Sequence, residues 1–413
     1  MNSIKNKIKS LTDNKQPDYT LFFLSSIMIV ISIVFSYSLS IYTVVYWDYE
    51  QFHFFYRQLF TGILSIFVMW TLAQIKPEIL IHNAGWFLFG LFLFLMSIMQ
   101  FLPSSFVTES GGAKRWIRLP GFSLSPVEFF KIGFIYYLSW SFHRKLTNIT
   151  KLPFKDELKL LLPYGIVFGF VVFLIAVLQK DLGQVVLLGS ILFVMLIFAN
   201  RSWKLFASLF GIAVVGVFSL IVLFPHRIIR IQSWWSMVQD SVLSIMPSFI
   251  ESRLRIDEFP EPYQVGHSLN AIHNGGLTGV GLGNGSLKLG FLSEVHTDFV
   301  LAGIAEEIGY LGLLTVLIIL FIIIFRVFRT SRRIEDVKFH LFSLGIGLMI
   351  TTAFFINAYG ISGMIPIKGI AVPFLSYGGS SMLAISIAIG MVLSISRNIP
   401  PKTTQVKKED KHE

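Results

Sequence analysis

The sequence His296-Thr297-Asp298-Phe299 stands directly before a long apolar segment, in which Glu306 and Glu307 follow. A carboxylate at the boundary between water and lipid can act as a general base toward a hydroxyl group within about 3 Å. Asp298 is the candidate for this role, although it can equally cap the helix that follows. Glu306 and Glu307 would lie roughly 12 Å deeper on that helix. We expect at least one of them to pair with a buried cation and to hold helices together.

A second group of residues, upstream, could bind phosphate. Lys114, Arg115 and Arg118 surround Trp116 and follow Gly111-Gly112. Guanidinium groups bind phosphate oxygens bidentately, and glycines let backbone donors approach, so these residues are suited to a pyrophosphate clamp. The same residues would equally serve as an anchor to lipid headgroups, with the tryptophan in the aromatic belt of the membrane. The motif alone leaves the two interpretations open.

Three further charged residues lie in or between apolar segments. Glu128 and Lys131 are one helical turn apart on one face, and we expect a structural ion pair, because two charges buried in lipid are costly unless they pair or line a polar cavity. Asp181 lies in the turn at 179–184, between two apolar segments. It is expected to cap the second of them, or to lie near whatever the residues around Arg115 bind.

The composition shows which elements must position these side chains. The chain has 413 residues, of which 54% are hydrophobic and 14% charged, and such a chain would expose large apolar patches as a soluble globule. Lipid is therefore the solvent for most of it. The sequence contains no cysteine, which excludes disulfides, thiolate metal sites and a cysteine nucleophile.

Ten apolar segments are long enough to cross about 30 Å of hydrocarbon as helices. They predict an all-α integral membrane protein, a polytopic bundle of about ten transmembrane helices that forms a single domain over residues 1–413. The large extracytoplasmic loop, 225–298, falls between helices 7 and 8. The segments are 21–45, 58–73, 86–102, 126–142, 161–178, 185–200, 205–224, 299–328, 339–359 and 380–396.

The basic residues are distributed unevenly between the two sides of this bundle. An even number of spans places the tails 1–18 and 398–413 on one side, together with the loop at 143–159. About two thirds of all Lys and Arg residues then lie on that side, which the positive-inside rule identifies as cytoplasmic. The first span has no small-residue cleavage site after it and is expected to be a retained helix. The net charge of +10 is thus mainly an orientation signal, and nucleic acid is not an expected partner.

Four loops remain for the outer side: 103–125, 179–184, 225–298 and 360–379. We expect them to converge on one face. The longest one opens with Arg227 and Arg230 and continues as an aromatic-rich amphipathic stretch, which we expect to lie on the membrane surface. Its glycine-dense end does not follow a strand, so a dinucleotide-binding fingerprint is rejected.

These motifs together resemble the SEDS family of FtsW- and RodA-type polymerases over essentially the whole chain. The residues at 281–284, Lys288 and Ile367-Lys368-Gly369 look more like the division branch, FtsW, than the elongation branch, RodA. In order along the chain, the matching sets are 112–116 with Pro126, Glu128 and Lys131; Gln179 with Asp181-Leu182-Gly183; 281–284 with 296–299 and 306–309; and Asn357 with Pro366, Gly369 and 373–381.

The chain departs from the family pattern at a few positions. Where the family usually has Gln-Pro-Ser-Glu, this chain has Ser125-Pro126-Val127-Glu128. Where it usually has Gln-Pro-Asp-Leu-Gly-Thr, this chain has Lys180 and Gln184. The loop at 231–262 is also longer than usual. These changes affect the expected geometry around Asp181 and the partner surface of the loop.

The resemblance implies a peptidoglycan glycosyltransferase that polymerises lipid II into β-1,4 glycan strands at the division septum, with Asp298 as general base. Lys114 and Arg115 would stabilise charge on the departing pyrophosphate. Whether a divalent cation such as Mg²⁺ or Mn²⁺ assists is left open. The substrate-binding residues that it implies are Lys114, Arg115, Trp116, Glu128, Lys131, Asp181, His296, Thr297, Ser376 and Ser380, with Glu306 and Glu307 in supporting positions.

The implied location is the bacterial inner membrane, with the site facing the periplasm. The implied partners are lipid II, a class B penicillin-binding protein, other division proteins and membrane lipid. Two other classes of function remain: a lipid II transporter, which would favour inverted repeats and charges near the bilayer midplane, and a non-catalytic division scaffold, which would need no carboxylate at Asp298. A RodA-type elongation polymerase is the alternative branch.

Overall fold

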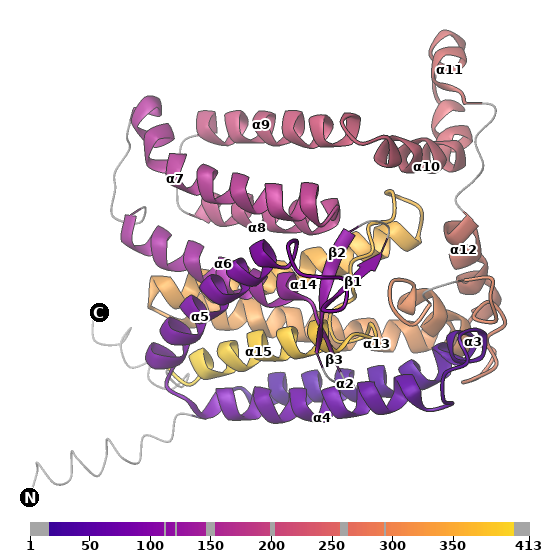
Figure 1. Ribbon diagram of the computed structural model, residues 1–413, viewed down its shortest axis with the longest axis horizontal. Coiled ribbons are helices and arrows are strands. Elements are labelled where there is room, and N and C mark those ends of the chain that lie inside the picture. Colours follow the sequence, from indigo (N-terminus) through magenta and orange to yellow (C-terminus); the bar gives the residue numbers. More distant parts are fainter. Residues whose placement is uncertain are drawn as a thin grey trace, which may run out of the picture.

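The computed structural model describes residues 16–110, 113–119, 122–145, 153–198, 203–256, 263–292 and 295–399. Gly111 and Gly112 of the predicted clamp, and most of both tails, lie outside these residues. Each of the ten predicted segments is a helix, and most of these helices run along the long axis of the molecule (Figure 1). They are α2 (Tyr19–Leu39), α4 (His53–Gln74), α5 (Pro77–Ile98), α6 (Pro126–Lys145), α7 (Phe154–Val172), α8 (Leu182–Phe198), α9 (Trp203–Val222), α13 (Val300–Arg333), α14 (Val337–Ile361) and α15 (Gly379–Ser396).

The predicted polytopic membrane fold is confirmed, although the helices differ in length and apolarity. Seven membrane spans are long and apolar enough by themselves among the described residues, and α7 contributes to one of them together with the π-helix η1 (Phe173–Leu178). The helix α8 is shorter, and α9 qualifies only jointly with α10 (Pro225–Leu243), across a bend of 99°. The helix α6 carries Glu128 and Lys131 and is largely buried inside the bundle, where it does not need to face lipid.

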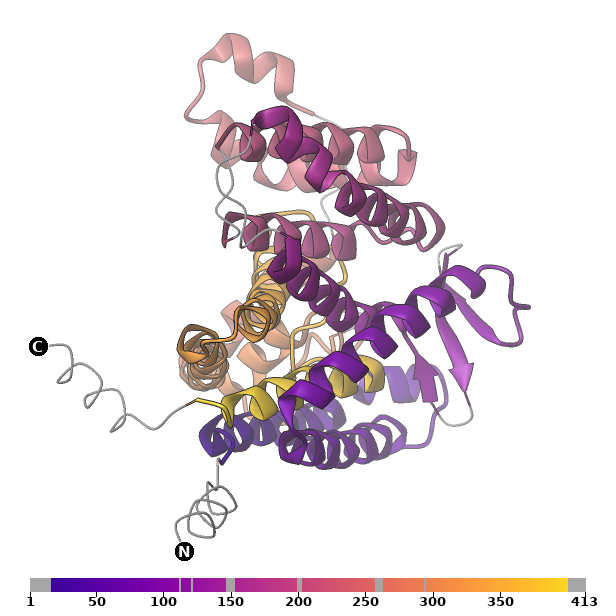
Figure 2. The ribbon, with the colours of Figure 1, turned by 90° about the vertical axis from the view of Figure 1, so that its left-hand side faces the viewer.

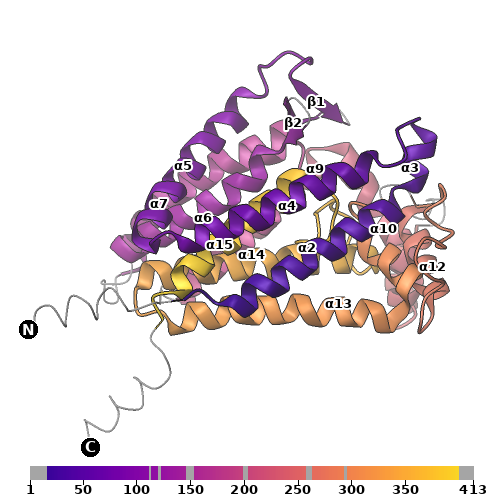
Figure 3. The same cartoon turned by 90° about the horizontal axis from the view of Figure 1, so that it is seen from below.

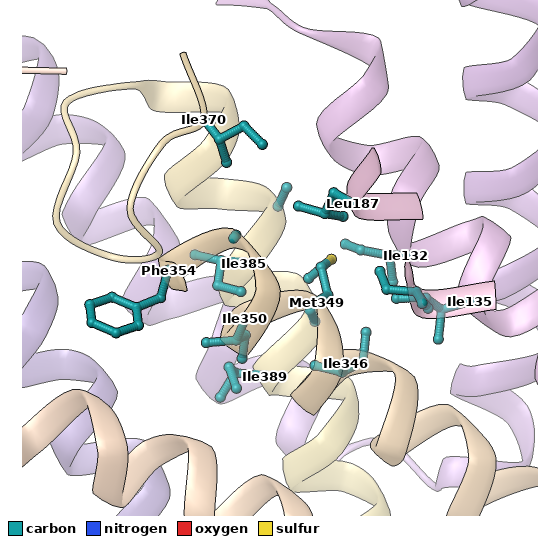
Figure 4. Close-up of a cluster of buried hydrophobic side chains, with 14 of the residues drawn as sticks. Ile132, Ile135, Leu187, Ile346, Met349, Ile350, Phe354, Ile370, Ile385 and Ile389 are labelled. Carbon is teal, nitrogen blue, oxygen red and sulfur yellow. The ribbon is translucent and has the colours of Figure 1, made fainter. Parts of the chain in front are cut away.

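The core lies where α6, α8, α14 and α15 meet. Ile132 and Ile135 of α6 pack with Ile346 and Met349 of α14 and with Ile385 of α15 (Figure 4). Around this centre, α5 packs on α6, and α4 packs on α2 and α15. Viewed along the bundle, α7 and α9 lie on one side, beyond α8 (Figure 2). The central helices are therefore buried all round, whereas the outer ones expose large apolar side chains to lipid.

Two details differ from the sequence-based prediction. The first predicted span ends early, because the chain breaks at Ser40 and continues as the short helix α3 (Ile41–Tyr46). The first outer loop also folds as an antiparallel sheet in the order β1-β2-β3, which was not predicted. Its strands are β1 (Val107–Ser110), β2 (Ala113–Leu119) and β3 (Phe122–Leu124). In β2, Ala113 and Ile117 are buried, and the pairing with β1 shifts register beside Arg115.

The two ends of the bundle have different contents. At one end lie the sheet, α3, α10, α11 (Ser248–Leu254) and α12 (Tyr263–Gly275) (Figures 1 and 3). At the other end, the start of α2 meets the end of α15, since the backbone N–H of Asp18 donates to Ser396 Oγ at 2.9 Å. Asp18 also pairs with Arg326 of α13 at 2.8 Å. The first and last spans thus begin and end on the same side, as an even number of crossings requires.

Candidate active site

A cavity of about 380 Å³ opens at the end of the bundle that carries the sheet. It is lined by residues from all four predicted outer loops, so the expected convergence of these loops is confirmed. Its charged or polar lining residues are Arg115, Lys180, Asp181, Arg227, Arg230, Ser233, Gln264, Asp298 and Lys368.

Asp298 lies in this cavity at the mouth of α13. The helix begins at Val300, and its N-cap is Phe299, without a side-chain cap hydrogen bond. The N-cap position is thus one residue later than the capping interpretation of Asp298 placed it. The backbone around it is fixed by Asn357, whose Nδ2 donates to the carbonyl of Asp298 at 2.7 Å and to that of Ile370 at 2.9 Å.

Gly369 lets the chain pass close to the Asp298 carboxylate. Its φ is +60°, which L side chains rarely adopt, and a Cβ at this position would lie 3.1 Å from Asp298 Oδ2. Any side chain here would crowd the carboxylate. The loop at 366–371 is thus shaped around Asp298, which places Lys368 in the same cavity.

Two arginines hold the turn that forms the opposite wall. Arg115 donates from Nε to the carbonyl of Gln179 at 2.8 Å and from Nη2 to that of Lys180 at 3.1 Å. Arg227 donates to the carbonyls of Ala176, at 2.6 Å, and Leu220, at 2.7 Å. Helix ends leave carbonyls without intrahelical partners, and here guanidinium groups satisfy them. Both arginines therefore shape the cavity as well as contribute charge to it.

The electrostatic balance of the cavity favours an anion. Five cationic side chains line it, whereas Asp181 and Asp298 are its two carboxylates. Burial, and then the neighbouring Arg230 and Arg227, lower the pKa of Lys368. Burial raises the pKa of Asp181, although the Arg115 guanidinium acts against this change. An anion that enters the cavity would relieve the repulsion among these cations.

Asp181, Glu128 and Lys131 form a connected group behind the cavity wall. Asp181 Oδ1 accepts a hydrogen bond from the backbone N–H of Gln184 at 3.2 Å, so it caps α8 as the sequence suggested. Gln184 Nε2 in turn donates to Glu128 at 3.1 Å. The expected ion pair between Glu128 and Lys131 is present at 2.8 Å. Of the three charged residues, only Asp181 reaches the large cavity.

Two residues of the predicted clamp do not line the cavity. Lys114 Nζ donates to the backbone carbonyls of Gln100, at 3.0 Å, and Leu102, at 2.7 Å. Trp116 lies opposite Thr108 in the sheet. The pairing of β1 with β2 shifts register between Thr108 and Glu109, so Arg115 is left without a partner in β1. Arg115 is therefore the one residue of the segment 114–116 that reaches the cavity.

Four other candidates support the backbone near Asp298 without lining the cavity. The ring of His296 packs against Phe54, with centroids 5.1 Å apart. Ser376 Oγ donates to the carbonyl of Thr297 at 2.7 Å. Ser380 Oγ donates to the carbonyl of Ser123 at 2.7 Å. These contacts tie the segment 296–298 to α4 and to the loop before α15, and they tie the sheet to α15 itself.

Glu306 and Glu307 are buried and have protein partners. Glu306 Oε1 accepts from the backbone N–H groups of Ser286, at 2.9 Å, and Leu287, at 3.2 Å. Glu307 pairs with Lys288 at 2.6 Å, and both side chains are almost fully buried. The glycine-rich loop before α13, and not a neighbouring helix, thus supplies the cation that the sequence led us to expect.

Sequence reasoning missed four cations of the cavity: Lys180, Arg227, Arg230 and Lys368. They lie far apart in the sequence and none belongs to the predicted clamp. A signal was nevertheless present. All four stand in loops assigned to the outer side, where the positive-inside rule expects few basic residues. Arg115 breaks the rule in the same way.

The site does not fit a metal ion held by the protein alone. Within the described ranges, no group of three or more His, Cys, Asp or Glu side chains is placed to hold one. Asp181 and Asp298 supply carboxylates, but cations surround them.

Comparisons with known proteins cover nearly the whole chain. The model of the FTSW_RODA_SPOVE family, described as "Cell cycle protein", matches residues 18–400. The chain is 49% identical over 385 residues to the "Probable peptidoglycan glycosyltransferase FtsW" of Helicobacter pylori strain J99, which covers 92% of this chain and 98% of the relative. It is 32% identical over 409 residues to the protein of the same name from Bacillus subtilis strain 168, covering 96% and 94%.

Solved structures share the fold. The rod shape determining protein RodA of Thermus thermophilus superposes with a TM-score of 0.61 at 21% identity, covering 94% of this chain and 98% of RodA. A chain of the structure described as "Structural coordination of polymerization and crosslinking by a peptidoglycan synthase complex" superposes with a TM-score of 0.68 at 22% identity, covering 92% and 98%.

Proposed function

The chain belongs to the FTSW_RODA_SPOVE family of cell cycle proteins, and from this membership and the site we propose that it is a peptidoglycan glycosyltransferase that polymerises lipid II. The observation that carries the assignment of the chemistry is the position of Asp298. Its carboxylate lines a cavity with five cations, and the N-cap position of the adjacent helix is Phe299. A carboxylate beside an anion-binding cavity is suited to remove a proton while the cations stabilise a departing phosphate group.

The reaction joins two saccharides. The hydroxyl at position 4 of an acceptor GlcNAc attacks the anomeric carbon of the donor MurNAc, and its proton passes to the Asp298 carboxylate. The bond between the anomeric carbon and the pyrophosphate oxygen breaks, and undecaprenyl pyrophosphate leaves with the electron pair. A direct displacement inverts the donor linkage from α to β. Lys368 and Arg230 lie where they can neutralise the charge that develops on the leaving group.

The test is the Asp298→Asn variant of the purified protein, given lipid II alone and assayed for glycan strands by gel electrophoresis. Asparagine keeps the size of the side chain but cannot take up a proton at neutral pH. General-base catalysis contributes about 10²–10⁴-fold, so we expect almost no polymer from a variant that remains folded and still binds lipid II. Near-normal polymerisation would exclude Asp298 as the base, and Asp181 would be the next candidate.

The wild-type protein in the same assay separates the classes of function. A polymerase makes glycan from lipid II without other proteins, whereas a transporter or a scaffold does not. Asp181→Asn serves as the matched control, because asparagine can still cap α8. If this control lost as much activity as Asp298→Asn, the assignment of distinct roles to the two carboxylates would be wrong.

We further infer that the site faces the periplasm at the division septum and that a class B penicillin-binding protein crosslinks the product. Support for the orientation comes from the basic residues concentrated at the other end of the bundle. Support for the partner comes from the fold shared with a chain of a peptidoglycan synthase complex. Support for the septum comes from similarity to proteins named FtsW.

A further inference from the structure

An exposed loop at the outer end of the molecule is unusually aromatic. Residues 45–52 run from the end of α3 to the start of α4, and all are exposed. Trp47 is 66% exposed, Tyr46 63% and Tyr49 46%. This end of the bundle is also the one that carries α12 (Figure 3). Exposed aromatic rings in a cluster are costly in water and mark a surface that binds something.

Aromatic contacts connect this loop to the catalytic segment. Tyr49 packs edge-on against Phe54, with ring centroids 5.6 Å apart. Phe54 contacts both His296 and Tyr377, in each case with centroids 5.1 Å apart. The backbone N–H of Tyr377 donates to the carbonyl of His296 at 2.8 Å. A continuous row of rings therefore extends from the loop to a residue two positions before Asp298.

The polar residues of the loop argue against a simple membrane anchor. Asp48 and Glu50 alternate with the aromatic residues, and both are exposed. Carboxylates are repelled by the phosphates of lipid headgroups, which attract basic residues instead. Asp48 adopts φ +54°, a conformation that few residues other than glycine take, and this turns the chain between Trp47 and Tyr49. The loop thus combines aromatic faces with hydrogen-bond acceptors.

This combination suits carbohydrate. The C–H face of a sugar ring is apolar and weakly positive, so it stacks on the negative face of an aromatic ring, while its hydroxyl groups donate to carboxylates. The two ends of the catalytic segment also face different surroundings: Asp298 lines the cationic cavity, and His296 packs on the aromatic row.

We propose that the exposed loop at 45–52 binds the growing glycan strand as it leaves Asp298, while the buried rings of Phe54 and His296 support this loop from behind. This inference rests on the function proposed above. The two parts of the donor would then lie on either side of Asp298. Its pyrophosphate would lie among the cations of the cavity, and its sugars would lie on the loop at 45–52. By holding the strand between additions, the surface sets how long the product becomes before it dissociates.

The experiment compares the Trp47→Ala/Tyr49→Ala double variant with the wild-type protein in lipid II polymerisation. We expect strands that are several-fold shorter, with little change in the initial rate of lipid II consumption, because the catalytic residues are untouched. Trp70→Ala is the matched control, since Trp70 lies in α4 toward the other end of the bundle, packed on Tyr19 and Phe22, and it should leave the length unchanged.

A binding measurement gives an independent readout. Chitotetraose, a β-1,4-linked GlcNAc tetramer, should bind the wild-type protein and the Asp298→Asn variant, and should bind the double variant much more weakly. Wild-type strand length in the double variant, or equal chitotetraose binding, would overturn the inference. So would efficient quenching of Trp47 fluorescence by brominated lipids, which would identify the loop as a membrane anchor. An absence of polymer from the wild-type protein would instead refute the proposed function.

Discussion

Lys368 is the residue whose surroundings most directly link the site to pH. Its pKa is lowered by burial and by Arg230 and Arg227, so Lys368 loses its proton at a lower pH than an exposed lysine does. An anionic substrate binds best while Lys368 is charged. We therefore expect the KM for lipid II to rise on the alkaline side, as Lys368 becomes neutral.

The Lys368→Arg variant tests this expectation, because arginine stays protonated throughout the accessible range. The rise in KM should move to higher pH in this variant, while kcat changes less. The measurement is a pH profile of KM and kcat for lipid II polymerisation. An identical alkaline limb in the variant and the wild-type protein would contradict the role of Lys368.

Arg115 has a double role, because it lines the cavity and also donates to two carbonyls of the turn before α8. Arg115→Ala removes charge-assisted hydrogen bonds that are worth on the order of 1.5–3 kcal/mol. We expect weaker lipid II binding and slower polymerisation. Arg118→Ala is the control, since Arg118 donates to Thr108 on the sheet and does not line the cavity. Unchanged donor binding in Arg115→Ala would favour the headgroup anchor over the clamp.

The site could be predicted from the sequence only in part, and the reason is geometric. Asp298, Asp181 and Arg115 stand in short motifs, and all three line the cavity. Lys114 is adjacent to Arg115, but it donates to the carbonyls of Gln100 and Leu102 instead, and no strand was predicted there. Lys180 stands where the family usually has proline. Its φ of +52° is one that proline cannot adopt, so the turn differs locally from the pattern that suggested it.

The helix α13, which begins two residues after Asp298, is interrupted at Gly309. This residue has φ +68°, and a Cβ there would lie 2.3 Å from the backbone N of Gly279. The break frees the carbonyls of Glu306 and Glu307, which accept from the N–H groups of Val280 and Gly281 at 3.0 Å. These backbone hydrogen bonds hold the glycine-rich loop against the helix. The side chains of the two glutamates also bind this loop, through the hydrogen bonds of Glu306 and the ion pair of Glu307.

Loss of the buried pair within this element should be costly. Glu307→Ala leaves the Lys288 ammonium buried without its partner, and removing one member of such a pair costs about 3–5 kcal/mol. We expect a clearly lower Tm for the variant in detergent. The double variant Lys288→Met/Glu307→Leu should recover much of that stability, because neither side chain is then charged. A double variant no more stable than Glu307→Ala would contradict this explanation.

At the scale of elements, hydropathy predicted the helices well because lipid requires every backbone hydrogen bond to close within a segment. The same rule does not apply outside the bilayer. The strands β1, β2 and β3 and the helix α3 are short and lie at the end of the bundle that carries the cavity. They depend on side chains from distant segments, such as Ser380 bonded to Ser123. The sequence around them carries no period long enough to reveal them.

The topology of the whole molecule can be tested by cysteine labelling, because the chain has no cysteine of its own. Ser252 of α11 and Glu335, which lies between α13 and α14, are both exposed. A membrane-impermeant thiol reagent applied to intact spheroplasts should label Ser252→Cys and not Glu335→Cys. The reverse pattern would invert the orientation and would place the site in the cytoplasm.

The packing of α15 has a consequence for biogenesis. This last helix lies mainly against α4, among the first to be synthesised. Its Gly390 is so close to α4 that a Cβ would lie 2.9 Å from that of Leu72, and its Ser394 donates to the carbonyl of Ile75 at 2.6 Å. While the ribosome is still translating the spans between α4 and α15, the surface of α4 that packs against α15 is not yet covered by it. Helix α15 can therefore take its place against α4 only after the spans between them have been synthesised.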